Sequence, residues 1–360
     1  MESVKHPVIQ DKEFSELVLN LKIGQSFAVA VSGGSDSMAL ALLAKQYAKS
    51  ADKSMIALIV DHKLRKESSS EAIKVSKLLE KRKISSQILV WKHLKTPRNI
   101  QASARKERYR LLIEECVKRG IPDLIFGHHM EDQMENFAIR LSRGSGLQGL
   151  SGMRRISKYK DTNVRILRPL LNISKERLKK TLQSRFDAIW VEDPSNQESK
   201  YTRVRMRGLF KDFELEGFSK KRFFRTIENL ARASDAIDFF SLKAIRKFSE
   251  INREGNFIIS LDILGYPEEI VLRSLSKILM AVGGREYTPR FEALHRLYTE
   301  IKKGKMPNYT LSGCCIKITS DNKMYVTKEL RGRSSLNRVH ECDSPKSGLE
   351  TYKGSITEKN

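Results

Sequence analysis

The first half of the chain alternates short apolar runs with longer amphipathic segments. Val and Ile are concentrated in runs that predict strands, at residues 27–31, 55–60, 84–91 and 123–126. Between these runs, apolar residues recur three and four positions apart, which is typical of helices that cover a core. These helical segments are 36–50, 68–83 and 101–119. The alternation predicts βαβ units, and hence an α/β fold with a parallel sheet between helices.

The pattern changes after residue 212. Helical periodicity and short β-rich runs now predict one or two helices, a strand, two more helices and a β-hairpin, over 218–248, 256–261, 267–281, 289–303, and 308–319 with 323–327. The last thirty residues are polar and poor in large apolar side chains, so we expect them to be disordered. The sequence therefore predicts an α/β domain, a helix-rich α+β module and a tail, over 1–212, 213–330 and 331–360.

The charge of the chain is strongly positive and unevenly distributed. Its 360 residues carry 67 Lys+Arg and 43 Asp+Glu, a formal net charge of +24. Residues 1–212 hold 41 basic and 24 acidic side chains, and 140–211 hold 18 and 6. Such a surplus favours nucleic acid as substrate or partner. The alternative is a Lys-rich composition without any role in nucleic-acid binding.

The sequence argues against a membrane protein and against a zinc or iron–sulfur site. No apolar run approaches the roughly 20 residues that cross a bilayer, and the first residues lack the apolar stretch of a secretory signal. The four cysteines, Cys116, Cys314, Cys315 and Cys342, show no CxxC spacing. We expect a soluble, cytoplasmic protein with structural cysteines, Cys116 sharing a helix face with Tyr109, Leu112 and Ile113. A homodimer is left open.

The strongest chemical signal follows the first predicted strand. The sequence Ser32-Gly33-Gly34-Ser35-Asp36-Ser37 joins this strand to a helix. Two glycines allow a sharp turn, while hydroxyls and free amides at a helix N-terminus can surround a phosphate group. No lysine follows the glycines, so the loop is not a Walker loop. Asp36 beside an anion site suggests Mg²⁺ bridging to a nucleotide; a plain helix cap is the alternative.

This loop resembles the signature of the PP-loop ATP pyrophosphatases, whose fold is of the adenine nucleotide alpha hydrolase type. Later motifs, taken in order, resemble one family of that group, the tRNA(Ile)-lysidine synthetases, over about residues 24–212. They are 61–65 (DHKLR), 104–109 (ARKERY), 127–136 (GHHMEDQMEN), 140–146 (RLSRGSG), 149–153 (GLSGM), 168–171 (RPLL), 193–196 (DPSN) and the run Arg203, Arg205, Arg207. Glu131 stands where the family usually has Asp, and Asn136 where Thr is common.

The resemblance implies a reaction and a set of roles. It implies that ATP adenylates the wobble cytidine of an isoleucine tRNA with a CAU anticodon, and that the side-chain amine of free L-lysine then displaces AMP to give lysidine. Residues Ser32 to Ser37 would hold the ATP phosphates, with Asp36 on Mg²⁺ and Asp61 and His62 near the adenosine. His129 and Arg108 would stabilise charge at the adenylate. The family's thiolating relatives use catalytic cysteines, which are not evident here.

A cluster of acidic side chains with a histidine follows the fourth predicted strand. His129, Asp132 and Glu135 are spaced three residues apart and would share one side of a helix. Two carboxylates beside ATP make sense if the second substrate is a cation, so we expect Asp132 and Glu135 to bind lysine. A metal-hydrolase ligand set is the alternative interpretation.

Two groups of arginines are candidates for tRNA binding. A glycine-rich stretch over 144–149 is flanked by Arg143, Arg154 and Arg155 and suits close approach of an RNA backbone; a plain connecting loop is the alternative. Arg203, Arg205 and Arg207 would share one face of an extended segment and could bind triphosphate or RNA phosphate. The alternative for this run is a solvated basic edge.

Overall fold

The structure is a computed structural model of the whole chain. It describes residues 7–92, 100–159, 162–190, 210, 216–217, 219–252, 255–285, 287–305 and 308–329. The chain divides into two compact units, Met1–Ala231 and Arg232–Asn360. The boundary expected near residue 212 and the tail 331–360 lie outside the described residues and stay predictions.

The first unit is built on a six-stranded sheet with the order β3-β2-β1-β4-β6-β5. Its strands are β1 (Ser26–Val31), β2 (Ser54–Asp61), β3 (Ser86–Val90), β4 (Asp123–Ile125), β5 (Ile156–Lys158) and β6 (Arg165–Leu167). All neighbouring pairs are parallel except β5 with β6. The strand order reverses between β1 and β4, which pair in parallel, so the segments that follow these two strands lie at a topological switch point, where α/β sheets bind ligands.

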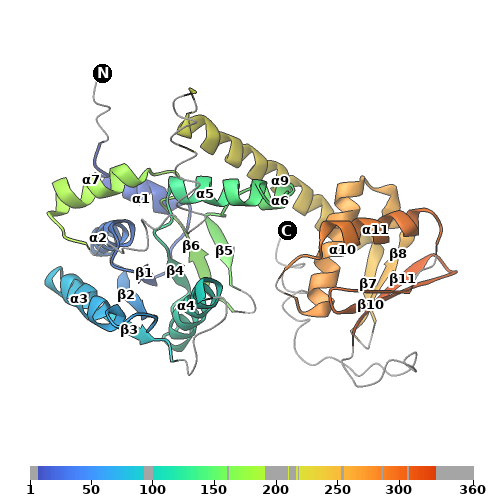
Figure 1. The fold of residues 1–360 in the computed structure, drawn as a ribbon, viewed down its shortest axis with the longest axis horizontal. Coiled ribbons are helices and arrows are strands. Elements are labelled where there is room, and N and C mark those ends of the chain that lie inside the picture. Colours follow the sequence, from blue (N-terminus) through green and yellow to red (C-terminus); the bar gives the residue numbers. More distant parts are fainter. Residues whose placement is uncertain are drawn as a thin grey trace. The chain divides into compact units, whose positions relative to one another are not determined.

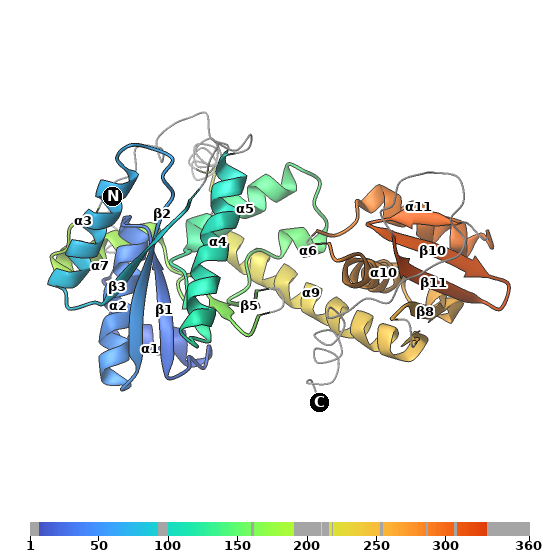
Figure 2. The same ribbon diagram turned by 90° about the horizontal axis from the view of Figure 1, so that it is seen from below.

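Helices cover both faces of this sheet (Figures 1 and 2). The helices of this unit that precede α9 (Lys220–Phe248) are α1 (Asp11–Leu19), α2 (Ser35–Ser50), α3 (Ser68–Lys81), α4 (Ile100–Lys118), α5 (Met130–Leu141), α6 (Leu147–Leu150) and α7 (Lys175–Phe186). Helices α1, α2, α3 and α7 bury their apolar sides in one core with alternate residues of β1 and β2. Helix α4 packs on the other face through Leu112, Ile113 and Cys116, as the spacing predicted.

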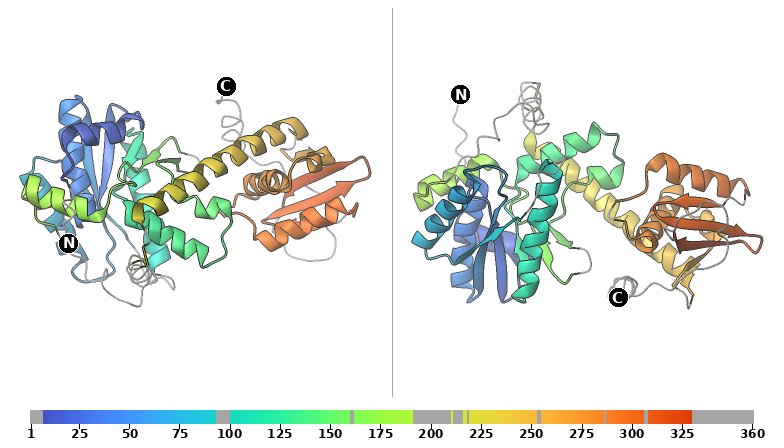
Figure 3. Two further views of the ribbon diagram at one scale, coloured as in Figure 1. Left: turned by 90° about the horizontal axis from the view of Figure 1, so that it is seen from above. Right: turned by 60° about the horizontal axis from the view of Figure 1, so that its bottom comes forward.

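The second unit combines helices with an antiparallel sheet (Figure 3). Its helical elements are the end of α9 (Lys220–Phe248), the 3-10 turn η2 (Leu261–Gly265), α10 (Glu268–Gly283) and α11 (Phe291–Lys302). The sheet order is β7-β8-β11-β10-β9, from β7 (Ser249–Ile251), β8 (Phe257–Ser260), β9 (Tyr309–Leu311), β10 (Cys314–Thr319) and β11 (Lys323–Lys328). An apolar core lies between the helices and one face of the sheet.

The second unit corrects two sequence-based expectations. The segment 308–319 is not one strand, because the chain turns at Ser312 and Gly313, whose positive φ angles of 57° and 79° close a tight hairpin between β9 and β10. Cys314 is buried as expected, but Cys315 is exposed because successive strand residues point to opposite faces.

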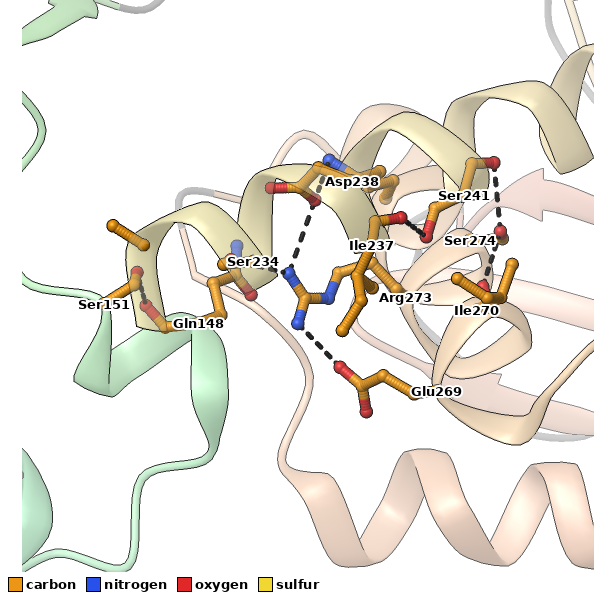
Figure 4. A network of polar contacts seen from close by, with 12 residues as sticks. Gln148, Ser151, Ser234, Ile237, Asp238, Ser241, Glu269, Ile270, Arg273 and Ser274 are labelled. Carbon is orange, nitrogen blue, oxygen red and sulfur yellow. Dashed lines mark hydrogen bonds and ion pairs between the residues drawn. The ribbon is translucent and has the colours of Figure 1, made fainter. Parts of the chain in front are cut away.

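A buried arginine organises the helices of the second unit (Figure 4). Arg273 of α10 is 6% exposed and donates hydrogen bonds to Ser234 and Asp238 of α9 and to Glu269 one turn earlier on α10. A charge buried at this depth needs several acceptors, and these contacts fix the pairing of α9 with α10.

Candidate active site

The loop between β1 and α2 has the geometry of an anion cradle. Gly33 has a φ of 87°, a conformation that favours glycine, and Gly34 is the N-cap of α2 without any side-chain cap. The Ser37 hydroxyl donates to the Gly34 carbonyl (3.0 Å) and accepts from the Ser32 N–H (3.1 Å), which closes the turn. The first amides of α2 are therefore available to a phosphate group.

Gly127 allows the loop after β4 to contact the start of α2. A Cβ atom at this position would lie 3.1 Å from the Asp36 carbonyl oxygen and 3.3 Å from the Ser37 Cα. Any larger residue would push the two loops apart, since backbone atoms cannot yield as a flexible side chain can. The residues after β1 and those after β4 thus form a single site.

His129 is the centre of that site. It is 2% exposed and forms the N-cap of α5 in a capping box, its N–H donating to the Asp132 carboxylate (3.0 Å). Its Nδ1 lies 3.0 Å from Glu131, and its Nε2 lies 3.4 Å from Asp36 and 3.6 Å from Asp132. Burial alone would lower the pKa of His129, but the charge of Asp132 and the contacts with Asp36 and Glu131 outweigh it and raise the pKa to about 10. The ring is therefore a cation at neutral pH.

His129 in turn lowers the pKa values of Asp36 and Glu131. Burial opposes ionisation of Asp36, but its hydrogen bond with His129, the charge of His129 and that of Lys175 hold its pKa below the ordinary value. Burial is likewise outweighed for Glu131, where His129 and the Lys175 N–H lower the pKa.

A cavity of about 270 Å³ adjoins this cluster on the side of Asp132. Its walls are strongly basic, and they come from α4, α5 and the segments around β5 and β6: Arg105, His128, Asp132, Asn136, Arg140, Gly152, Met153, Arg154, Ser157 and Arg168. Burial and then the charges of Arg168, Arg108 and Arg105 lower the pKa of His128 well below 6.5, so this ring is neutral. His128 Nδ1 and Arg168 Nε are buried without a hydrogen-bond partner among the described residues, as expected of groups that await a ligand.

Gln133 holds one wall of the cavity in place. Its side chain is 3% exposed, and its amide donates to the Met153 carbonyl (2.9 Å) while its oxygen accepts from the Met153 N–H (2.6 Å). Gly152, with a φ of 71°, leaves room for Gln133 and for Ile227 of α9. The wall is thereby tied to α5, which carries Asp132.

The predicted adenosine-side residues lie at the end of β2. Asp61 is 3% exposed, and its carboxylate accepts from the Ser68 and Ser69 hydroxyls and the Lys63 N–H, so it anchors the start of α3. Burial and the charge of Arg108 lower the pKa of His62 to about 4, although Asp61 opposes the shift. The side chains of His62 and Arg108 are thus close enough to interact.

The predicted tRNA-binding arginines are only partly described. Arg143 is exposed after α5. Arg154 donates to the Ala231 carbonyl (3.2 Å), and Arg155 lies 3.4 Å from the Asn172 side-chain oxygen. The glycine-rich stretch includes the short helix α6. Arg203, Arg205 and Arg207 lie outside the described residues.

Sequence reasoning missed Lys175 and the roles of Glu131 and Gln133. Lys175 begins α7, its Nζ lies 3.6 Å from Asp36, and its N–H donates to Glu131 (2.9 Å). Ser174 is a typical N-cap, and the basic residue that follows it was the local signal for Lys175. The sequence does not show that α7 packs beside α2, which is what places Lys175 in the site.

Comparisons with known proteins agree with this geometry. Residues 7–212 match the PP-loop domain model. The tRNA(Ile)-lysidine synthase of Orientia tsutsugamushi is 38% identical over 81% of this chain and 67% of its own length, and that of Wolbachia pipientis wMel 37% identical over 84% and 71%. The U34-tRNA thiolase NcsA from Methanococcus maripaludis aligns with a TM-score of 0.52 over 61% of this chain and 79% of its own, at 20% identity, a likeness of fold alone.

The class of protein follows from the loop, the sheet and the domain match: the first unit is a PP-loop ATP-binding domain. Within that class, the chain belongs to the tRNA(Ile)-lysidine synthase family. It is an ATP-dependent ligase that modifies tRNA. No helix among the described residues is both long and apolar enough to cross a membrane.

Proposed function

We propose that the chain joins L-lysine to the wobble cytidine of isoleucine tRNA with a CAU anticodon, through an adenylated cytidine. A pyrimidine carbonyl oxygen is a poor leaving group, and joining it to the α-phosphate of ATP turns it into part of AMP, which leaves readily. The observation that carries the proposal is a phosphate cradle and a basic cavity that meet at one cluster, formed by Asp36, His129 and Asp132.

The phosphate side of the site has a simple division of roles. The loop over Ser32 to Ser37 and the N-terminus of α2 hold the ATP phosphates. The Asp36 side chain is 23% exposed beside this loop, and Mg²⁺ is commonly bound through one or two carboxylates plus substrate phosphates, so Asp36 suits that ion. Mg²⁺ bound there would offset phosphate charge. His129 keeps the Asp36 carboxylate ionised and oriented.

The lysine side of the site is centred on Asp132. Its carboxylate lines the cavity and is held by the His129 N–H, while Glu135 is buried one turn further along α5. A carboxylate fixed in this way can hold an ammonium group of lysine. The basic walls suit the anionic phosphates of an anticodon loop, whose single-stranded cytidine is unstacked at little cost.

The proposal also covers the other tRNA contacts, the location of the enzyme in the cell and its oligomeric state. Six arginines would bind tRNA phosphates: Arg143, Arg154, Arg155, Arg203, Arg205 and Arg207. The module over 213–330 would be a further tRNA-binding part of the chain. A cytoplasmic location follows from the tRNA substrate, and a homodimer is compatible with it.

The proposal is tested by ATP–pyrophosphate exchange with and without isoleucine tRNA. We expect exchange only when tRNA is present, because the cytidine accepts the adenylate. Exchange without tRNA would instead indicate a synthetase that activates a small molecule.

A variant tests the lysine site separately. In D132N, the amide oxygen can still accept from the His129 N–H, but the negative charge is gone. Since hydrogen bonds to charged groups contribute about 1.5 to 3 kcal/mol, the KM for lysine should rise about 10- to 100-fold, with tRNA-dependent exchange retained. An unchanged KM for lysine would contradict the assignment of Asp132.

A further inference from the structure

Lys175 is a cation beside Asp36 whose backbone is fixed while its head group is loosely held. Its N–H donates to Glu131 (2.9 Å), and two residues earlier the Ile173 carbonyl accepts from the Met130 N–H (2.9 Å). These bonds join the starts of α5 and α7. The Lys175 Nζ, in contrast, lies 3.6 Å from Asp36, beyond hydrogen-bond length, and its side chain is 29% exposed.

The head group stands where negative charge is to be bound. The N-termini of α2, α5 and α7 meet around Asp36, since Gly127 brings α5 to α2 and Glu131 joins α5 to α7. The start of α5 is closed by its capping box and that of α7 by the Ser174 hydroxyl, which accepts from the Arg177 N–H. The start of α2 has neither a capping box nor a side-chain cap. An anion there therefore meets the amides of α2 and the Lys175 Nζ together.

A purely structural role for Lys175 explains less of this arrangement. Asp36 already has the cationic His129 ring at 3.4 Å and a hydrogen bond from the Ser35 hydroxyl at 3.1 Å. His129 is shared with Glu131 and Asp132, so Lys175 offsets part of the remaining negative charge, but charge balance alone does not require a partly exposed head group beyond hydrogen-bond length. A flexible ammonium group with three donors is well suited to follow phosphate oxygens as their charge changes.

We propose that Lys175 is a catalytic residue that stabilises the pyrophosphate leaving group; this inference rests on the proposed function. As the cytidine carbonyl oxygen forms its bond to the α-phosphorus of ATP, the bond from that phosphorus to the bridging oxygen breaks, and pyrophosphate leaves with the electron pair. The Lys175 Nζ moves from Asp36 to the β-phosphate oxygens, where the new charge develops. The interaction is stronger in the transition state than in bound ATP, so it acts mainly on the rate.

The test compares K175M, K175R and a matched control, K179M, which makes the same change one turn further along α7. Single-turnover transfer of AMP from labelled ATP to isoleucine tRNA is measured without lysine, and calorimetry gives the Kd for ATP and for magnesium pyrophosphate. In K175M we expect transfer to slow about 10²- to 10³-fold, the Kd for pyrophosphate to rise about 10-fold, and the Kd for ATP to rise less. K175R should recover most of the rate, and K179M should match the wild type.

Two results would overturn the inference. One is AMP transfer by K175M within about threefold of wild type. The other is an equal loss of the AMP-transfer rate in K175M and K175R, together with an unchanged Kd for pyrophosphate and a lowered melting temperature. That result would make Lys175 a structural residue. If the wild-type chain transfers no AMP to tRNA, the proposed function fails instead, and pyrophosphate binding by K175M against wild type still decides the role of Lys175.

Discussion

Two adjacent histidines show how the site sets charge at the scale of single residues. His129 faces three carboxylates, which raise its pKa to about 10, so it is a fixed cation. His128 is buried towards arginines, and burial with their charges keeps it neutral. The sequence identifies His129 as a site residue and gives His128 only as part of a motif. It does not reveal their opposite protonation states, which depend on side chains from α2, α4 and the segment after β6.

His62 gives a prediction at this scale. Burial and the charge of Arg108 lower its pKa from 6.5 in the unfolded chain to about 4 in the folded one. Below pH 6.5 the unfolded chain therefore binds a proton that the folded chain does not, and stability falls until the pH reaches about 4. The unfolding free energy of wild type should fall as the pH is lowered from 7 to 4.5. In H62Q, which has no proton to bind at this position, we expect the fall to be smaller by about 2 kcal/mol. Urea unfolding at both pH values measures this, and equal losses in the two proteins would contradict it.

At the scale of elements, the parts that carry local signals could be predicted from the sequence. The alternation of strands and helices, the cradle after β1 and the start of α5 all follow from residues close together in the chain. The short strands β5 and β6 and helix α7 were not predicted. Strands of three residues, such as Ile156–Lys158, carry too few positions to show a period. Lys175 could not be assigned because its position depends on the packing of α7 against α2, which no local pattern contains.

The link between α5 and the cavity wall supplies a prediction at this scale. Gln133 satisfies both backbone groups of Met153, so Q133L leaves a donor and an acceptor unpaired in a buried place. We expect Q133L to be destabilised by about 2 to 4 kcal/mol, and the amide hydrogen of Met153 to exchange much faster.

Q133E is the matched control for that change. It keeps an oxygen for the Met153 N–H, but it replaces the donor to the Met153 carbonyl with a negatively charged oxygen. We therefore expect the Met153 amide hydrogen to stay more protected in Q133E than in Q133L, even if the unfolding free energy in urea falls in both. If the Met153 amide hydrogen of Q133L exchanged at the wild-type rate, Gln133 would not hold this wall.

At the scale of the whole molecule, the net charge of +24 predicts how tRNA binding depends on salt. The surplus is densest over 140–211, which follows the acidic cluster in the chain and includes three of the arginines that line the cavity, Arg140, Arg154 and Arg168. Neutralising RNA phosphates releases counterions, so affinity falls steeply with salt. We expect the Kd for tRNA to rise at least about 100-fold between 50 and 200 mM KCl.

The salt dependence of the KM for lysine is the control for the salt dependence of tRNA binding. Lysine binding depends on a few fixed groups around Asp132, so its KM should change only a few-fold over the same range of salt. Filter binding and steady-state assays measure the two quantities. A tRNA affinity insensitive to salt would show that the basic surplus is not the tRNA-binding surface.

The central claim is that one site joins ATP chemistry to lysine and to a particular tRNA. The most direct measurement incubates the chain with ATP, radiolabelled lysine and tRNA transcripts that all carry CAU anticodons, from isoleucine and from methionine acceptors. The account predicts that label enters the isoleucine tRNA, in amounts that match AMP release, and not the methionine tRNA. Label in neither tRNA, or in both alike, would contradict it.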